Sequence, residues 1–258
     1  MIAPTGRRWS NAQTRPEIAG HRASAPESAV AECSAQMSVD VIISYDGTEN
    51  DDDALALGGL LARDATRIAL AYVRHAPEFD PDREALAQHD AEYRLAHGAA
   101  GLGNPEIPQH VILAASTGAG LEELAAAEEA SVIVFGSDYR TPPGHAEPPA
   151  SAQRLLEIGA TGIAVAAAGL RADREAKLAS IAVLSPDGDD AAQRTADALA
   201  ARLGSQSVPP GTPAALNVVG SQPGAPAGRI ALSGAARSLL DASRGSVLVV
   251  PSGRPIQL

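Results

Sequence analysis

The amino-acid sequence predicts an α/β protein, in which a parallel β-sheet is covered by helices on both faces. Hydrophobic residues make up 45% of the chain but aromatic residues only 3%. The core is therefore built mainly from Ala, Val, Leu and Ile, as is usual in helix-covered parallel sheets. From Val39 onward, short apolar runs alternate with stretches whose apolar residues recur at helical spacing, and this alternation is typical of parallel sheets.

The first strand and helix are predicted at the start of this pattern. Residues 39–44, VDVIIS, form a short β-branched run, and residues 50–64, NDDDALALGGLLARD, have apolar residues at helical spacing. The acidic first turn of this helix suits the positive end of the helix dipole. Asp46 and Gly47 lie between the two elements. Asp46 either makes the turn and caps the helix, or it binds a ligand at the carboxyl end of the strand.

The same alternation continues as far as residue 167. Each predicted strand is a continuous apolar run, which indicates burial on both faces of the sheet. Strands are predicted at residues 67–73, 110–116, 131–137 and 161–167, and helices at residues 82–103, 120–130 and 151–159.

The remainder of the chain repeats part of this pattern. A strand leads into Asp-Gly at Asp46-Gly47 and again at Asp187-Gly188, and the segment VIVFGS is matched later by LNVVGS. Shared landmarks of this kind indicate an internal repeat.

The spacing of these landmarks shows which part of the repeat is shortened. The distance from Gly136 to Val165 is 29 residues, and so is the distance from Gly220 to Val249. In contrast, the Asp-Gly turn precedes the glycine by 90 residues in the first copy and by 33 in the second. The second copy is therefore predicted to lack one strand and two helices from its middle.

These observations divide the chain into three parts. Residues 1–36 are rich in Ala, Ser, Pro and Arg without apolar periodicity, and we expect a disordered extension there. Residues 37–169 are predicted to form a full domain, and residues 178–255 an abbreviated one. The sequence leaves open whether translation starts at Met1 or at Met37.

Composition limits the partners of this protein. The formal net charge is -11, which disfavours binding to nucleic acids and to anionic membranes. No apolar run reaches the length of a membrane span, and no apolar segment follows Arg7 and Arg8 as a secretory signal requires. The single cysteine, Cys33, excludes a disulfide framework within one chain. We therefore expect a cytoplasmic location.

The residues described above resemble the universal stress protein family, in the tandem arrangement that is common in actinobacteria. The resemblance covers approximately residues 39–253 and rests on the strand-Asp-Gly turn, on VIVFGS and VVGSQPGAPAGRIALSGAARSLL, and on a closing Val-rich strand. It implies a five-stranded parallel sheet of order 3-2-1-4-5, with helices on both faces, followed by a truncated second copy. It also implies a stress-response regulatory module rather than an enzyme.

The resemblance further implies a site for ATP or AMP, with no metal other than nucleotide-associated magnesium. In the family, the phosphates lie on a loop with the pattern glycine, two residues, glycine, nine residues, glycine, then Ser or Thr. In this sequence the later positions fall on Tyr139, Pro149 and Ala150, and proline has no N–H to offer a phosphate. Triphosphate binding is therefore expected to be weakened. The predicted nucleotide ligands are Asp46, Gly47, Val73, Gly136, Ser137, Arg140 and Ser151.

Two further motifs have both a functional and a structural interpretation. The acids from Glu49 to Asp53 imitate a metal site, but a solvated first helical turn is favoured because their spacing is not that of a calcium loop. Gly118 and Gly120, with Asp138 beyond them, imitate a dinucleotide fingerprint. The third position of that fingerprint is Glu123, which would oppose a pyrophosphate, so a loop turn is favoured there.

The sequence shows no catalytic machinery. It contains no Gly-x-Ser-x-Gly elbow and no P-loop, and its histidines show no metal-like spacing. A nucleotide-free interaction scaffold is the main alternative function, and a small-molecule hydrolase or ligase on the same frame is a weaker one. A protein partner is also possible. In the family, domains pair through the fifth strand, so IAVAA (163–167) and VLVVP (247–251) are expected to pair within one chain or between two chains.

Overall fold

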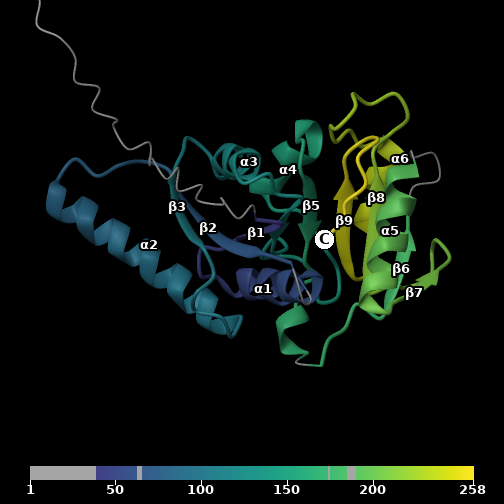
Figure 1. Cartoon of the computed structure of the whole chain (residues 1–258), viewed down its shortest axis with the longest axis horizontal. Helices are drawn as coiled ribbons and strands as arrows, with labels where there is room; N and C mark the ends of the chain where they lie inside the picture. Colours follow the sequence, from purple (N-terminus) through teal and green to yellow (C-terminus); the bar gives the residue numbers. More distant parts are fainter. Residues whose placement is uncertain (1–38, 63–65, 174, 185–189) are drawn as a thin grey trace, which may run out of the picture. The chain divides into compact units, whose positions relative to one another are not determined.

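A computed structural model describes residues 39–62, 66–173, 175–184 and 190–258 (Figure 1). The predicted N-terminal extension, both candidate start residues and the second Asp-Gly turn at Asp187 lie outside these residues.

The first half of the described chain forms the predicted five-stranded parallel sheet. Its strands run in the order β3-β2-β1-β4-β5, and every neighbouring pair is parallel. The predicted fold class and strand order are therefore confirmed. The strands are β1 (Val41–Ser44), β2 (Ile68–Arg74), β3 (Gln109–Leu113), β4 (Val132–Phe135) and β5 (Gly162–Val165), and the helices are α1 (Glu49–Leu61), α2 (Pro81–Gly101), α3 (Thr117–Ala127) and α4 (Ala150–Ile158).

The second half repeats this arrangement in shortened form. The strand order β7-β6-β8-β9 corresponds to β2-β1-β4-β5, and within the described residues there is no counterpart of α2, β3 and α3. This is the loss that the spacing of the landmarks predicts. The elements are β6 (Ser180–Val183), α5 (Asp190–Leu203), β7 (Gln206–Val208), β8 (Leu216–Gly220), α6 (Gly234–Ala242) and β9 (Ser246–Val250), preceded by the 3₁₀ helix η1 (Leu170–Ala172).

The two copies join through their last strands into one nine-stranded sheet. Strands β5 and β9 are antiparallel, with Ala164 opposite Leu248. The predicted pairing of the fifth strands is thus confirmed within the chain. Because β5 and β9 run in opposite directions, the carboxyl ends of the strands lie at one edge of the sheet in the first copy and at the other edge in the second.

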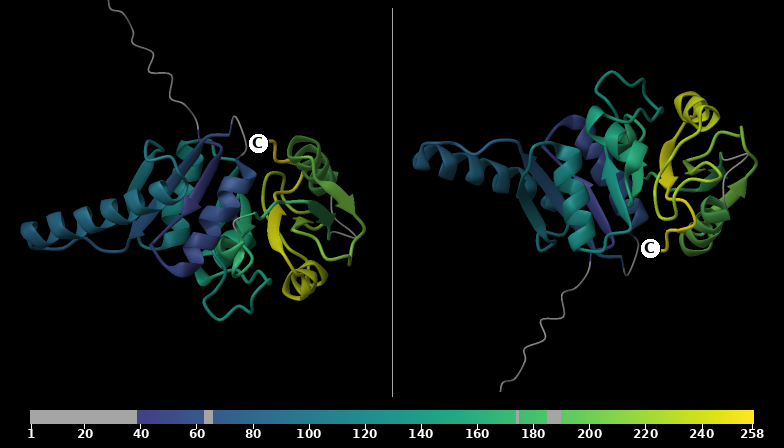
Figure 2. Two further views of the ribbon diagram at one scale, coloured as in Figure 1. Left: turned by 90° about the horizontal axis from the view of Figure 1, so that it is seen from below. Right: turned by 90° about the horizontal axis from the view of Figure 1, so that it is seen from above.

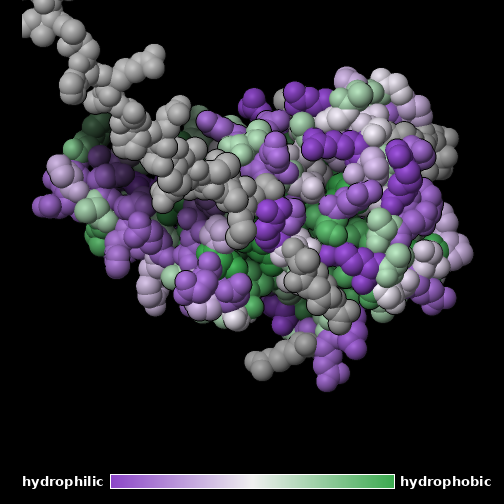
Figure 3. Space-filling view, in the orientation of Figure 1, coloured by the Kyte–Doolittle hydropathy of each residue, from purple (hydrophilic) through white to green (hydrophobic). Residues whose placement is uncertain are grey.

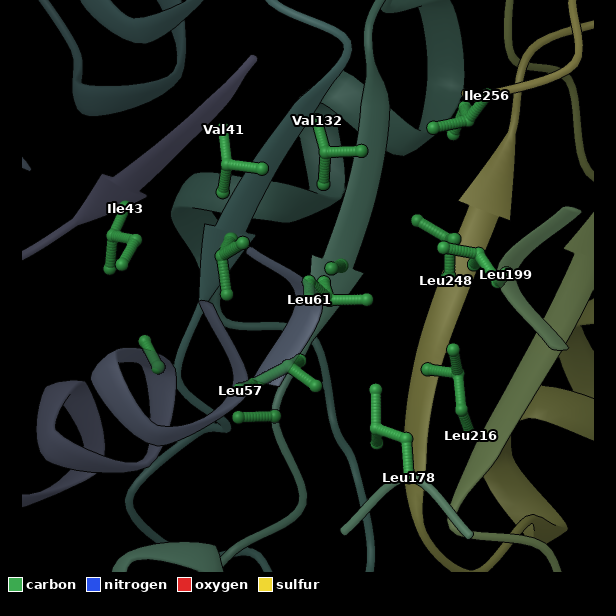
Figure 4. Packing of buried hydrophobic residues seen from close by; sticks show 14 of the residues in the cluster. Val41, Ile43, Leu57, Leu61, Val132, Leu178, Leu199, Leu216, Leu248 and Ile256 are labelled. Atoms are coloured by element: carbon green, nitrogen blue, oxygen red, sulfur yellow. The ribbon is translucent and has the colours of Figure 1, made fainter. Parts of the chain in front are cut away.

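Helices cover both faces of this sheet (Figures 1 and 2). One core cluster contains residues of α1, α2 and α5, and the other contains residues of α3, α4 and α6. Each cluster includes residues from both copies. Figure 4 shows the first cluster, with Leu57 and Leu61 of α1 on one side and Leu199, Leu216 and Leu248 of the second copy on the other. The two copies therefore share their cores as well as their sheet.

The prediction of a loop turn at Gly118 and Gly120 is wrong, because both residues lie inside α3. The helix begins earlier because the side chain of Ser116 accepts a hydrogen bond from the Ala119 N–H. A Cβ at Gly118 would lie 2.9 Å from the Ser151 carbonyl oxygen, and one at Gly120 would lie 2.9 Å from the Ala114 Cβ. These glycines let α3 pack closely against its neighbours.

The expectation of a fully solvated acidic turn is also wrong for α1. Asp53 is 0% exposed, and its carboxylate accepts hydrogen bonds from the Gly169 and Arg171 N–H groups at 2.8 Å each and from Arg171 Nη1 at 2.9 Å. Glu49 is exposed but bonds the same guanidinium at 2.8 Å. The first turn of α1 thus binds the segment that leads into the second copy.

Candidate functional site

A cavity of about 450 Å³ lies where β1, β2 and β4 end. Ligands of open α/β sheets collect at this edge, outside the carboxyl ends of the strands, and the volume is within the range of small-molecule sites. Five of the predicted site residues line this cavity: Asp46, Val73, Gly136, Ser137 and Ser151.

The other two predicted residues, Gly47 and Arg140, are not among the lining residues. Gly47 has a φ of 89° in the turn between β1 and α1. The guanidinium carbon of Arg140 lies 4.8 Å from the ring centroid of Tyr139, so this arginine packs on its neighbour at the surface.

Two carboxylates form the acidic wall of the cavity. The Asp46 N–H donates to Asp51 Oδ2 at 2.9 Å, and the Thr48 N–H donates to Asp46 Oδ1 at 3.1 Å. The Thr48 hydroxyl also donates to Asp51 Oδ2, at 2.9 Å. Burial, together with the neighbouring Asp46, raises the pKa of Asp51 to about 7. Asp51 is therefore a proton-holding acid close to neutral pH, and it can offer a ligand either a donor or an acceptor.

Another part of the lining is apolar. Ala71, Tyr72 and Val73 come from the end of β2, and Phe135 is the last residue of β4. The Arg94 guanidinium covers this part, because its carbon lies 5.6 Å from the Tyr72 ring centroid and its Nη1 donates to the Asp46 carbonyl oxygen at 3.2 Å. A lining that combines carboxylates with apolar side chains suits a ribose and an aromatic base, which present hydroxyl and amino donors as well as flat apolar faces.

Position 136 requires a glycine because the backbone at Asn50 approaches it closely. A Cβ at this position would lie 2.1 Å from the Asn50 carbonyl oxygen. The first turn of α1 therefore packs directly on the end of β4, and this contact explains the glycine without a phosphate. A side chain at residue 136 would push α1 away from the cavity.

Ser137 uses its hydroxyl inside the protein. It is 3% exposed, donates to the Ala166 carbonyl oxygen at 2.6 Å and accepts from the Glu147 N–H at 3.1 Å. In the second copy, Ser221 makes the same two contacts, with Val250 at 2.9 Å and Ala231 at 3.2 Å. A hydroxyl has one proton to donate, so this side chain closes the loop rather than donating to a ligand.

The loop that follows Ser137 satisfies many of its own backbone donors. The Glu147 N–H bonds the Ser137 hydroxyl, and the Gly144 N–H bonds the Ala168 carbonyl oxygen at 2.9 Å. A phosphate cradle requires N–H groups that point outward at the anion, and these groups point elsewhere. Four more backbone N–H groups of the loop donate within it, namely those of Asp138, Arg140, Thr141 and His145.

A second hollow, of about 410 Å³, adjoins the cavity and shares His75, Thr117 and Ser151 with it. Arg154, from the second turn of α4, also lines it. The two ring nitrogens of His75 lie 3.4 Å from the Ala114 carbonyl oxygen and 3.4 Å from the Thr117 hydroxyl. This hollow offers a phosphate the cation Arg154, whereas Arg140 of the loop after Ser137 does not line the cavity.

Sequence reasoning missed Asp51, Arg94 and His75 as lining residues. Asp51 had a usable signal, because Thr48 and Asp51 have the spacing of a capping box, which fixes the acid against the turn. Arg94 had none, since it reaches the Asp46 carbonyl across 48 residues of sequence.

Two further findings concern metal ligands and membrane-spanning helices. Among the described residues, no group of three or more His, Cys, Asp or Glu side chains could hold a metal ion. None of the helices in the described part of the chain is both long and apolar enough to cross a membrane.

Comparison with known proteins identifies the fold. No protein-family profile and no curated protein matches the sequence. A universal stress protein structure from Archaeoglobus fulgidus DSM 4304 aligns with a TM-score of 0.60 at 15% identity, over 83% of this chain and 98% of that chain.

Two further solved structures match less extensively. A protein of the universal stress protein family from Burkholderia pseudomallei has a TM-score of 0.33 at 24% identity, over 47% of this chain and 89% of its own. A universal stress protein from Archaeoglobus fulgidus in complex with dAMP has a TM-score of 0.32 at 12% identity, over 38% and 80%. These two scores are too low to add to the argument. On the first alignment, which extends over both copies, the chain has the fold of the universal stress proteins.

Proposed function

We propose that this protein is a tandem universal stress protein and acts as a non-catalytic, cytoplasmic regulatory module that binds ATP or AMP. Residues 37–169 would be its full domain and residues 178–255 its abbreviated one. The observation that supports nucleotide binding is the cavity where β1, β2 and β4 end, which is lined by the carboxylates of Asp46 and Asp51 and by apolar residues from the end of β2.

The adenosine part of the ligand fits this cavity best. Asp46 and Asp51 line the cavity and can accept hydrogen bonds from ribose hydroxyls or from the amino group of adenine, and Val73 and Phe135 supply apolar contact. Burial of an aromatic base against such residues is favourable because apolar surface leaves water.

The phosphates are proposed to lie outside the loop of residues 136–149. Six of its backbone N–H groups donate within the protein, and Pro149 has none to give. The neighbouring hollow, lined by His75, Ser151 and Arg154, offers a cation instead. Any magnesium would accompany the nucleotide.

The experiment is a calorimetric titration of the full chain with AMP and with ATP, each with and without magnesium. We expect saturable heat, and we expect Asp46→Ala to abolish it. Asp187→Ala, the matching position of the abbreviated copy, is the control and should leave binding unchanged. Absence of heat at millimolar nucleotide would refute nucleotide binding.

A nucleotide-free interaction scaffold is the second candidate. It is favoured by the loop after Ser137, where the serine hydroxyl and six backbone N–H groups donate inside the protein. Protein purified from cells distinguishes the two functions: a nucleotide released on denaturation and detected by mass spectrometry would reject the scaffold.

A further inference from the structure

The amino-terminal half of α2 extends beyond the sheet (Figures 1 and 2). All of the buried residues of this helix lie in its carboxyl-terminal half: Ala91, Leu95, Gly98 and Ala99. Its amino-terminal half is attached to the sheet by Arg74, which donates to both carboxylate oxygens of Glu84 at 2.8 and 2.7 Å and to Gln88 at 3.2 Å. The polar side of the helix is thus fixed to β2, and the opposite side faces solvent.

The solvent-facing side has an apolar stripe. Leu86 is 60% exposed and Tyr93 is 70% exposed. They are seven residues apart and so lie on one face of the helix. Ala96 and Ala100 are also exposed and continue this face at spacings of three and four. Phe79, at the entrance to the helix, is fully exposed and lies seven residues before Leu86. We call Phe79, Leu86 and Tyr93 the α2 stripe.

We propose that the α2 stripe is an interface with a second copy of this chain, in which two α2 helices pack antiparallel about a twofold axis near Leu86. A twofold interface uses the same patch on both partners, and the spacing of the stripe suits this. With Leu86 opposite Leu86 of the second copy, Tyr93 of each chain lies at the level of the helix entrance of the other chain, where Phe79 is exposed.

The charges beside the stripe favour the antiparallel orientation. Arg83 and Asp90 are both exposed and lie on either side of Leu86. In the antiparallel arrangement Arg83 faces Asp90 of the second copy, and this happens twice. In a parallel pair, Arg83 and Asp90 of the two chains would be separated by about 10 Å along the helix axis, so neither charge would meet its opposite.

The size of the stripe predicts a weak dimer. Aromatic side chains bury roughly 150–250 Å² each, so two copies of the stripe bury about 1,000 Å² in total, the low end for specific interfaces. The surface over α2 agrees with this, since Figure 3 shows a few hydrophobic residues there among many hydrophilic ones. A dissociation constant of about 1–100 µM is expected for an interface of this class.

Sedimentation equilibrium of the full chain tests the proposal, over concentrations from about 1 to 200 µM to span that range. We expect a monomer–dimer equilibrium that Leu86→Glu and Tyr93→Glu each weaken by about tenfold or more. Tyr139→Glu is the matched control, because Tyr139 is 72% exposed and belongs to the loop after β4 rather than to α2, and it should leave the equilibrium unchanged.

A charge exchange tests the orientation. Arg83→Asp should weaken the dimer severalfold, and the double variant Arg83→Asp/Asp90→Arg should restore it, because each pair then has opposite charges again. A monomer at the highest concentration would overturn the proposal. So would a dimer that Leu86→Glu leaves intact while circular dichroism shows an unchanged helix content, since the copies would then meet elsewhere.

Discussion

Replacement of Asp53 by Asn is predicted to destabilise the protein substantially. The carboxylate is completely buried and accepts three hydrogen bonds, from the Gly169 N–H, the Arg171 N–H and Arg171 Nη1. The Asn side chain has nearly the same shape, but it has lost the charge, and its amide group would direct an N–H at one of these donors.

The magnitude follows from what remains after the substitution. Removing one partner of a buried ion pair costs about 3–5 kcal/mol, because the other charge is left uncompensated. Arg171 is 33% exposed, so water can reach it, and it keeps its bond to Glu49. We therefore expect a loss near the lower limit, about 3 kcal/mol in the free energy of unfolding.

Urea denaturation followed by circular dichroism measures this loss. Glu49→Gln is the control, since it removes a bond to the same guanidinium from a carboxylate that is 86% exposed, and such pairs contribute less than about 1 kcal/mol. If Asp53→Asn cost no more than Glu49→Gln, the buried carboxylate would not stabilise the contact between α1 and the segment before the second copy, and the reasoning would be wrong.

Four other substitutions test the site and its counterpart in the second copy. Ser137→Ala and Ser221→Ala should each lower the free energy of unfolding by about 1–3 kcal/mol in urea denaturation, because each leaves a loop N–H without its acceptor. The two losses should be similar, because the two serines make matching contacts. Gly136→Ala should lower the thermal midpoint and weaken any nucleotide binding, since its Cβ would lie 2.1 Å from the Asn50 carbonyl oxygen; unchanged stability would contradict this. Because the pKa of Asp51 is raised from 3.8 to about 7, its stabilising effect is present in acid and is lost as the pH rises through 7. The free energy of unfolding of Asp51→Asn should therefore depend less on pH between about 4 and 7, and an unchanged profile would assign the titration to another group.

Much of the architecture could be predicted because it depends on patterns along the chain. Continuous apolar runs identified the strands, and the equal spacing of Gly136 to Val165 and Gly220 to Val249 identified the repeat. The position of a site at the carboxyl ends of β1 and β2 followed from the general rule for open α/β sheets. Each of these predictions depends on residues that are close together in the sequence, or on landmarks that recur at a fixed spacing.

The sequence by itself therefore determined the fold class, the shortened second copy and the edge of the sheet where a site can form. Only the tertiary structure decided how individual polar groups are used. The sequence predicts a solvated acid at Asp53, but Arg171, 118 residues later, packs against it. It predicts a ligand at Ser137, but the Ala166 carbonyl oxygen accepts the hydrogen bond of that hydroxyl. The physical reason is that burial and hydrogen-bond partners depend on which distant segments meet, and a local pattern does not contain that information.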